Sequence, residues 1–102
     1  MTKEDAIKTL DEFRVQIDDL DRRIVELLNQ RTKVVEQIGR VKRDAQLPIY
    51  EPRREDMVFR NVTESNTGPL TPEALKRVFE RIIDEMRTVQ RVRMENRGDK
   101  QW

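Results

Sequence analysis

The sequence predicts an all-α protein with three helices: one long, one short and one medium. Apolar residues recur at alternating steps of three and four along most of the chain, which is the spacing of one helix face. Charged residues make up 40% of the 102 residues and apolar residues 35%, with only 3 Gly and 4 Pro. This balance suits long solvated helices better than a sheet. Two Pro-containing stretches, "AQLPIYEP" and "SNTGPL", then divide the pattern into three segments.

The first helix is expected over about residues 4–44. Its apolar stripe consists of Leu10, Phe13, Ile17, Leu20, Ile24, Leu27, Val34, Ile38 and Val41. Such a helix would be roughly 60 Å long at 1.5 Å per residue. A compact domain of this size has a radius of gyration of only roughly 13 Å. Because the rest of the chain cannot cover so long a stripe, we expect an obligate homodimer, intertwined through its long helices.

The second helix is expected over about residues 53–64, with Met57, Val58 and Val62 facing inward. Pro48 precedes it and ends the first helix, because proline disfavours helix at the residue before it and lacks a backbone donor.

The third helix is expected over about residues 72–96, after a turn in "SNTGPL". Thr71 is expected as its N-cap, with Pro72 at the first helical position. Its inward side is expected to carry Leu75, Val78, Phe79, Ile82, Ile83, Met86, Val89 and Gln90. The whole chain, 1–102, is interpreted as one domain that ends in a flexible tail, 97–102.

The composition excludes several classes of function. The chain has no Cys and no His, and Ser65 is its only serine. Disulfides, thiol chemistry and the usual metal sites are therefore excluded, and hydrolase-type nucleophilic catalysis has almost nothing to use. The net charge of +1 gives little attraction to nucleic acid. With no signal peptide and no apolar run that could span a bilayer, we expect a cytoplasmic protein without metal or cofactor.

Several charged residues sit where an apolar residue is expected. Arg31 occupies a position of the apolar stripe, and Lys42 lies about 20° away around the helix and about 16 Å along its axis. Their long side chains could hold one small anion between them. Arg14 lies about 25 Å before Arg31, so it could serve the same anion only from an antiparallel partner chain.

Other polar residues also point inward or lie at an entry to the bundle. Gln90 falls on the inward face of the third helix, and Arg54 and Glu55 open the second helix. A plainer interpretation stays open for each: Arg31 as a device that fixes register, Gln90 in a structural hydrogen bond, and Arg54 and Glu55 as ordinary first-turn charges.

Together, inward cations without matching inward acids favour an anionic ligand. Without His, Cys or a metal cluster, a rearrangement that needs only positioning and electrostatic stabilisation is the chemistry best served.

The chain resembles the all-helical AroQ-type chorismate mutases, in their bacterial monofunctional form. The resemblance covers about residues 10–91 and depends on "LDEFRVQIDDLDRRIVELLNQRTKVVEQIGRVK", "PIYEPRRE" and "IIDEMRTVQ". It implies conversion of chorismate to prephenate in aromatic amino-acid biosynthesis. The implied site residues are Arg14 (from the other protomer), Arg31, Lys42, Glu51, Arg54, Glu55, Met86 and Gln90.

The resemblance also implies a role for each of these residues. Arg31, Lys42 and the partner's Arg14 would bind the carboxylates, and Lys42 and Gln90 would donate to the ether oxygen. Glu55 would accept from the ring hydroxyl, with Glu51 as a helper nearby and Arg54 ordering the loop.

One residue departs from the pattern. Met86 stands where some relatives place a hydroxyl residue, which implies a weaker grip on one carboxylate. We also expect that feedback control, if present, needs a separate regulatory partner enzyme of the shikimate pathway.

Two alternatives stay open. An isochorismate-pyruvate lyase uses the same scaffold but tends to lack the carboxylate that Glu55 supplies. A non-catalytic helical dimerisation module would explain the apolar stripe, but not the inward cations and amide.

Overall fold

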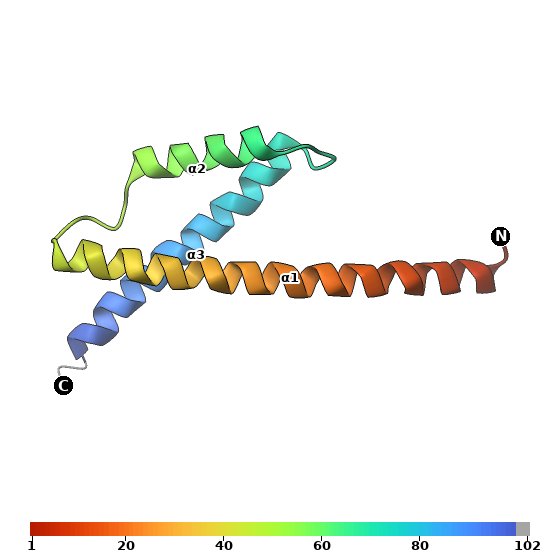
Figure 1. Ribbon diagram of the computed structural model, residues 1–102, viewed down its shortest axis with the longest axis horizontal. Coiled ribbons are helices and arrows are strands. Elements are labelled where there is room, and N and C mark those ends of the chain that lie inside the picture. Colours follow the sequence, from red (N-terminus) through yellow and green to blue (C-terminus); the bar gives the residue numbers. More distant parts are fainter. Residues whose placement is uncertain (100–102) are drawn as a thin grey trace. The chain divides into compact units, whose positions relative to one another are not determined.

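The computed structural model describes residues 1–99, and the side chains of residues 1–93. Its helices are α1 (Lys3–Asp44), α2 (Pro52–Ser65) and α3 (Pro72–Asp99) (Figure 1). The all-α class and the order of one long, one short and one medium helix are confirmed.

The third helix continues beyond the predicted end near residue 96. Residues 97–99, predicted as the start of a flexible tail, belong to α3, because Arg, Met and Glu before them are strong helix formers. The rest of that predicted tail, 100–102, lies outside the described residues.

Close contacts divide the chain into two units, residues 1–33 and 34–102. The first unit is the N-terminal part of α1. Its first turn is capped reciprocally: Oγ1 of Thr2 accepts from the N–H of Asp5 at 3.1 Å, and the Asp5 carboxylate faces the N–H of Thr2 at 3.5 Å. The capped turn fixes where α1 begins.

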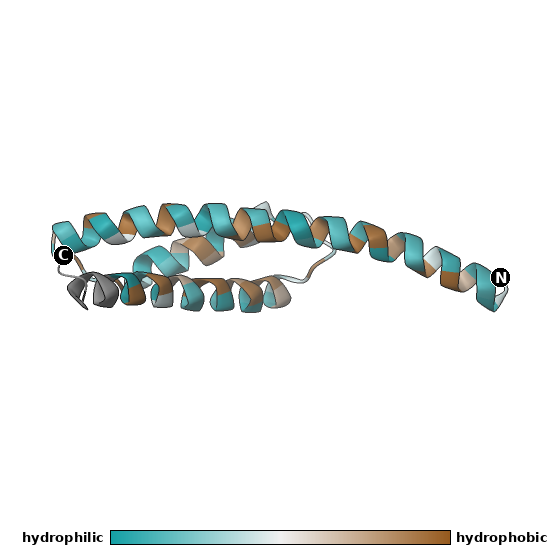
Figure 2. Ribbon diagram, turned by 90° about the horizontal axis from the view of Figure 1, so that it is seen from below, coloured by the Kyte–Doolittle hydropathy of each residue, from teal (hydrophilic) through white to brown (hydrophobic). Residues whose placement is uncertain are grey.

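The apolar stripe of α1 is exposed in the single chain. Figure 2 shows apolar segments recurring along this helix. Phe13 is 58% exposed and Leu27 is 62% exposed. The exposed stripe residues are Leu10, Phe13, Ile17, Leu20, Ile24, Leu27, Val34, Ile38 and Val41. A stripe this regular is typical of a helix that packs against another helix.

In the second unit, α2 packs on α3, and α3 crosses the C-terminal part of α1 (Figure 1). Among the residues whose side chains are described, the buried hydrophobic ones are Val35 of α1 and Ile83 of α3, and Gln90 of α3 is the buried polar one. The prediction that Gln90 faces inward is confirmed. Of the residues predicted to face inward on α2, Val58 and Val62 are half-buried, whereas Met57 is 50% exposed.

The end of α1 turns the chain toward α2. The N–H of Leu47 donates to the carbonyl of Lys42 at 2.6 Å, and the N–H of Gln46 donates to that of Arg43 at 3.1 Å. Gln46 has a φ of 58°. This is the Schellman pattern of hydrogen bonds with Gln in place of the more common Gly. The turn places residues 48–51 beside the last turns of α1.

The turn between α2 and α3 is built on side-chain hydrogen bonds. Oδ1 of Asn66 accepts from the N–H of Gly68 at 3.0 Å, and its Nδ2 donates to the carbonyl of Leu70 at 2.8 Å. Gly68 supplies the positive φ of 77°. Oγ1 of Thr71 then accepts from the N–H of Ala74 at 3.1 Å, which confirms Thr71 as the N-cap of α3.

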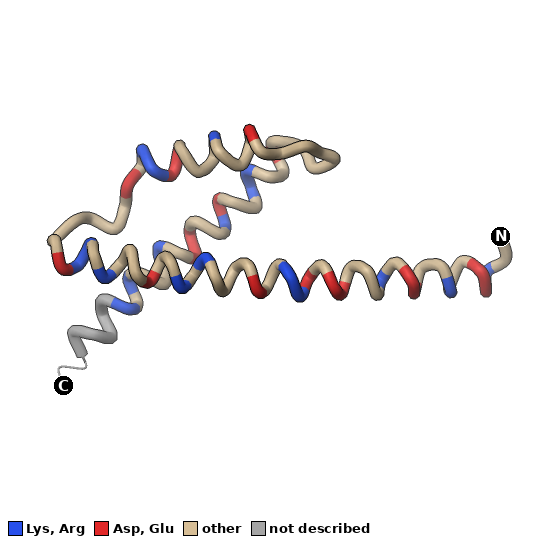
Figure 3. The backbone as a smooth tube through the Cα atoms, in the orientation of Figure 1, with Lys and Arg blue, Asp and Glu red and all other residues tan. Residues whose placement is uncertain are grey.

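Charges of both signs are interspersed along all three helices (Figure 3). Many are ordinary surface pairs one helical turn apart, such as Arg23–Asp19 and Arg81–Glu85. No helix in the described part of the chain has the uninterrupted apolar length needed to cross a bilayer.

Candidate active site

Gln90 is the most buried of the predicted site residues, at 7% exposed. Its Nε2 donates to the backbone carbonyl of Val35 on α1 at 3.3 Å. This hydrogen bond offsets the cost of burying the amide, which would otherwise be roughly 1–3 kcal/mol. The amide is therefore held in place between α1 and α3.

Gly39 makes room for this amide. It is buried on α1, one turn after Val35, and a Cβ added there would lie 3.3 Å from Cγ of Gln90. Glycine in the middle of a helix usually costs about 1 kcal/mol relative to alanine. The glycine is explained here by the close approach of the Gln90 side chain.

Replacing Gly39 by Ala is expected to lower activity while leaving stability nearly unchanged. The new methyl group displaces the Gln90 side chain by a few tenths of an ångström. At the same time, alanine stabilises the helix by about 1 kcal/mol relative to glycine. Thermal unfolding and initial rates on the same samples test this, with the exposed neighbour Arg40→Ala as the control. Loss of stability in proportion to loss of activity would contradict it.

Lys42 lies one turn after Gly39 on the same face of α1. Its side chain is 11% exposed, and its Nζ lies 2.8 Å from Oε1 of Glu51. The same Nζ donates to the backbone carbonyl of Ile49 at 3.0 Å. The expectation that inward cations lack acid partners is therefore wrong for Lys42, because the loop before α2 folds back and brings Glu51 to it.

Glu55 has a partner that the sequence did not indicate. Its Oε2 lies 3.3 Å from Nε of Arg87, one turn before Gln90 on α3. Arg87 is held in turn by Asp84 at 2.7 Å and lies over the ring of Tyr50 at 5.5 Å. The position of Arg87, a charged residue one turn before Gln90 beside the apolar stripe of α3, is the sequence signal that could have indicated this partner.

The other predicted site residues lie in less enclosed positions. Arg54 is exposed in the first turn of α2, and Met86 is half-buried one turn before Gln90. In the first unit, Arg31 is half-buried. Arg14 is exposed there and pairs with Asp11 at 3.4 Å.

Contacts and one-turn spacings on the helices connect these residues of the second unit into one group. Lys42 contacts Glu51, whose carbonyl accepts from the N–H of Glu55 at 3.1 Å. Glu55 contacts Arg87 on α3, and Gln90 follows one turn later. Gln90 then packs against α1 one turn before Lys42. Two cations, two carboxylates and a buried amide are thus grouped where α1, α2 and α3 meet.

Such a group can bind and polarise a small polar molecule. Lys42 and Gln90 are N–H donors, and Glu51 and Glu55 are acceptors. No group of three or more potential metal ligands occurs among the residues described. The chemistry that this arrangement offers is hydrogen bonding and electrostatic stabilisation.

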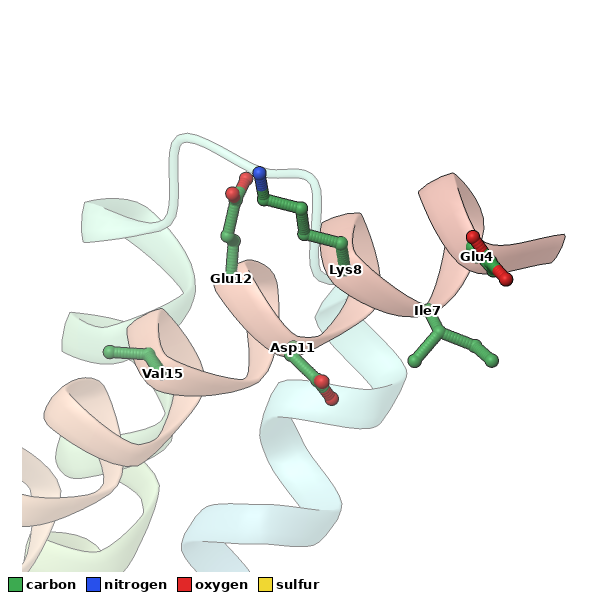
Figure 4. A pocket seen from close by; sticks show the side chains of 6 residues that line it. All are labelled: Glu4, Ile7, Lys8, Asp11, Glu12 and Val15. Atoms are coloured by element: carbon green, nitrogen blue, oxygen red, sulfur yellow. The ribbon is translucent and has the colours of Figure 1, made fainter. Parts of the chain in front are cut away.

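A shallow hollow is formed by other residues than this group. It lies on the first turns of α1, between side chains spaced one turn apart (Figure 4), and its lining residues are Glu4, Ile7, Lys8, Asp11, Glu12 and Val15. All six come from one helix face and its edges, so we interpret the hollow as the groove between neighbouring surface side chains.

Comparison with known families gives a match over most of the chain. The model of the family described as chorismate mutase type II matches residues 13–91. The bifunctional chorismate mutase/prephenate dehydratase of Stutzerimonas stutzeri is 35% identical over 88 residues, which are 81% of this chain and 23% of that protein. The chain thus spans about a quarter of the length of such bifunctional relatives. The chorismate mutase of Methanocaldococcus jannaschii is 23% identical over 95 residues, covering 92% of this chain and 96% of that one.

Two solved structures share the fold over nearly their whole length. Form II of the chorismate mutase from Thermus thermophilus gives a TM-score of 0.80 at 29% identity, covering 81% of this chain and 94% of that chain. The chorismate mutase from Helicobacter pylori, solved in complex with prephenate, gives a TM-score of 0.81 at 25% identity, covering 86% and 96%. With the matching family model, these similarities show that the chain belongs to the chorismate mutase type II family.

Proposed function

We propose that the protein is a chorismate mutase, an isomerase that converts chorismate to prephenate by a [3,3] rearrangement. The observation that carries the proposal is the buried Gln90 amide, packed against α1 one turn before the enclosed Lys42. These are two N–H donors on facing helices, and the family to which the chain belongs supports this use of them.

The reaction needs no proton transfer, which suits a chain without His or Cys. Chorismate must be held in its compact diaxial conformer, so that the bonds that form and break are aligned. As the C–O bond breaks, negative charge grows on the ether oxygen. Donation from Lys42 and Gln90 to that oxygen strengthens in the transition state and so lowers the barrier.

The contacts of Lys42 leave it able to act in this way. An ammonium group has three N–H donors, and the Ile49 carbonyl and the Glu51 carboxylate each take one. The third remains to be directed at a substrate oxygen. Its two protein partners fix the direction of the group, which reduces the reorganisation required on binding.

The remaining roles follow the family pattern. Glu55 accepts from the ring hydroxyl, with Glu51 nearby, and Arg54 orders the start of α2. Arg31 binds a substrate carboxylate. Because Met86 offers no hydroxyl donor, we expect weaker binding of one carboxylate, with the chemistry retained.

We further propose an antiparallel homodimer that buries the exposed stripe of α1 and brings Arg14 of one protomer to the site of its partner. The regular exposure of the stripe supports the dimer. The distance between Arg14 and Arg31, about 25 Å along an ideal helix, requires the partner chain for a shared substrate. A cytoplasmic location and a separate regulatory enzyme stay predictions from the sequence.

The test is an assay of the purified protein with chorismate and, in parallel, with isochorismate, with the products identified. Prephenate from chorismate is the expected result. Salicylate and pyruvate from isochorismate, with little prephenate, would favour the lyase and mean that Glu55 has another role. No turnover of either compound would favour the non-catalytic dimer.

A further inference from the structure

Arg87 is held from three directions. Its Nε lies 3.3 Å from Oε2 of Glu55 on α2, and its Nη2 lies 2.7 Å from Oδ1 of Asp84 on its own helix. Its guanidinium carbon lies 5.5 Å from the centre of the Tyr50 ring, in the segment before α2. The side chains of Arg87 and Glu55 are only 33% and 20% exposed.

We infer that Arg87 is a positioning residue for Glu55 and fixes the direction in which this carboxylate meets the substrate. The inference rests on the proposed function. Arg87 does not touch the substrate in this account, and it acts only through Glu55. None of the roles assigned to the other site residues includes it.

A glutamate side chain has several rotatable bonds and therefore considerable freedom of its own. Glu55 lies in the first turn of α2 and reaches across to α3. Without a partner, its carboxylate could rotate among several staggered conformers. The guanidinium is rigid and planar, and Asp84 and Tyr50 hold it in turn. Its buried Nε makes no hydrogen bond, so it holds one carboxylate oxygen of Glu55 by ion pairing alone. The other oxygen keeps its acceptor sites for a hydroxyl group.

A merely structural role of Arg87 would have different experimental consequences. If Arg87 only tied α2 to α3, its replacement would lower stability and affect every site residue alike. A positioning role instead predicts the kinetic signature of Glu55 itself. A hydroxyl contact made in both the substrate and the transition state contributes mainly to KM.

The experiment is a double-mutant cycle on the full chain, with kcat and KM for chorismate measured well below the unfolding temperature. The variants are Arg87→Gln, Glu55→Gln and the two combined. Arg81→Gln is the matched control, because Arg81 lies on the same helix and pairs with Glu85 at 2.8 Å, but its side chain is 77% exposed. Circular dichroism checks that each variant folds.

We expect Arg87→Gln to lower kcat/KM by roughly ten- to a hundredfold, mainly through KM, as misplacement of a binding group does. In the Glu55→Gln background, Arg87→Gln should lower kcat/KM by less than about twofold. The carboxylate through which Arg87 acts is already absent there. Arg81→Gln should behave as wild type. Arg87→Lys keeps the positive charge but lacks the planar guanidinium group. Its KM should lie between those of Arg87→Gln and the wild type.

Two results would overturn the inference while leaving the proposed function intact. One is an Arg87→Gln variant that matches Arg81→Gln in KM, and the other is an equal loss in both backgrounds. If Arg87→Gln fails to fold, Arg87→Lys carries the same cycle. A wild-type protein that makes no prephenate would overturn the proposed function itself, and that assay comes first.

Discussion

Replacing Lys42 by Ala is expected to lower kcat for chorismate by about 10²–10³-fold, the usual cost of removing one donor to a developing oxyanion. The ammonium group is directed by its contacts with Ile49 and Glu51. Initial rates at saturating chorismate measure the effect directly.

The fold should survive this change. Glu51 loses its partner, but its side chain is 47% exposed and can be hydrated instead. Removing the lysine therefore leaves no unpaired charge buried, because the enclosed member of the pair is the one that is removed. Lys33→Ala is the matched control, because Lys33 is an exposed lysine of the same helix. Equal activity of the two variants would show that Lys42 does not take part in the reaction.

Replacing Leu20 by Glu is expected to dissociate the dimer and, with it, to abolish activity. Full burial of a leucine side chain contributes roughly 1.5–3 kcal/mol. A symmetric dimer loses that contribution twice, and the new carboxylates would also have to be buried. The isolated chain has little core to compensate, since Val35 and Ile83 are its buried hydrophobic residues among those described.

Val15→Glu is the matched control for this experiment. Val15 is also apolar and exposed, but it lies on the opposite face of α1 from Leu20. Sedimentation equilibrium and helicity at several protein concentrations should separate the two variants. If Leu20→Glu remains dimeric, or if both variants dissociate alike, the stripe is not the interface.

The helices were predictable from local signals. Thr71 and Pro72 mark the start of α3, and the proline after Leu47 marks the end of α1, because caps and proline act through the adjacent backbone. The inward position of Gln90 followed from the period of the apolar stripe. Such signals are local, so they can be interpreted without knowing how the helices pack against one another.

The contacts of the charged residues were not predictable in the same way. The pairing of Lys42 with Glu51 depends on the turn at Gln46, which has a positive φ. A positive φ is not predicted from glutamine, because this position is usually occupied by glycine. The pairing of Glu55 with Arg87 depends on how α2 packs on α3. Both are set by tertiary structure, which is why the pattern of residues alone predicted inward cations without acids.

The central claim is that the charge in the apolar stripe of α1 serves a substrate and not the architecture. The measurement that tests it most directly is chorismate turnover by Arg31→Leu beside wild type, with thermal unfolding on the same samples. Leucine continues the stripe, so we expect a protein that stays folded and a rate lower by about 10²–10³-fold. A folded variant that still makes prephenate at the wild-type rate would contradict the account, because Arg31 would then only set the register of the helices.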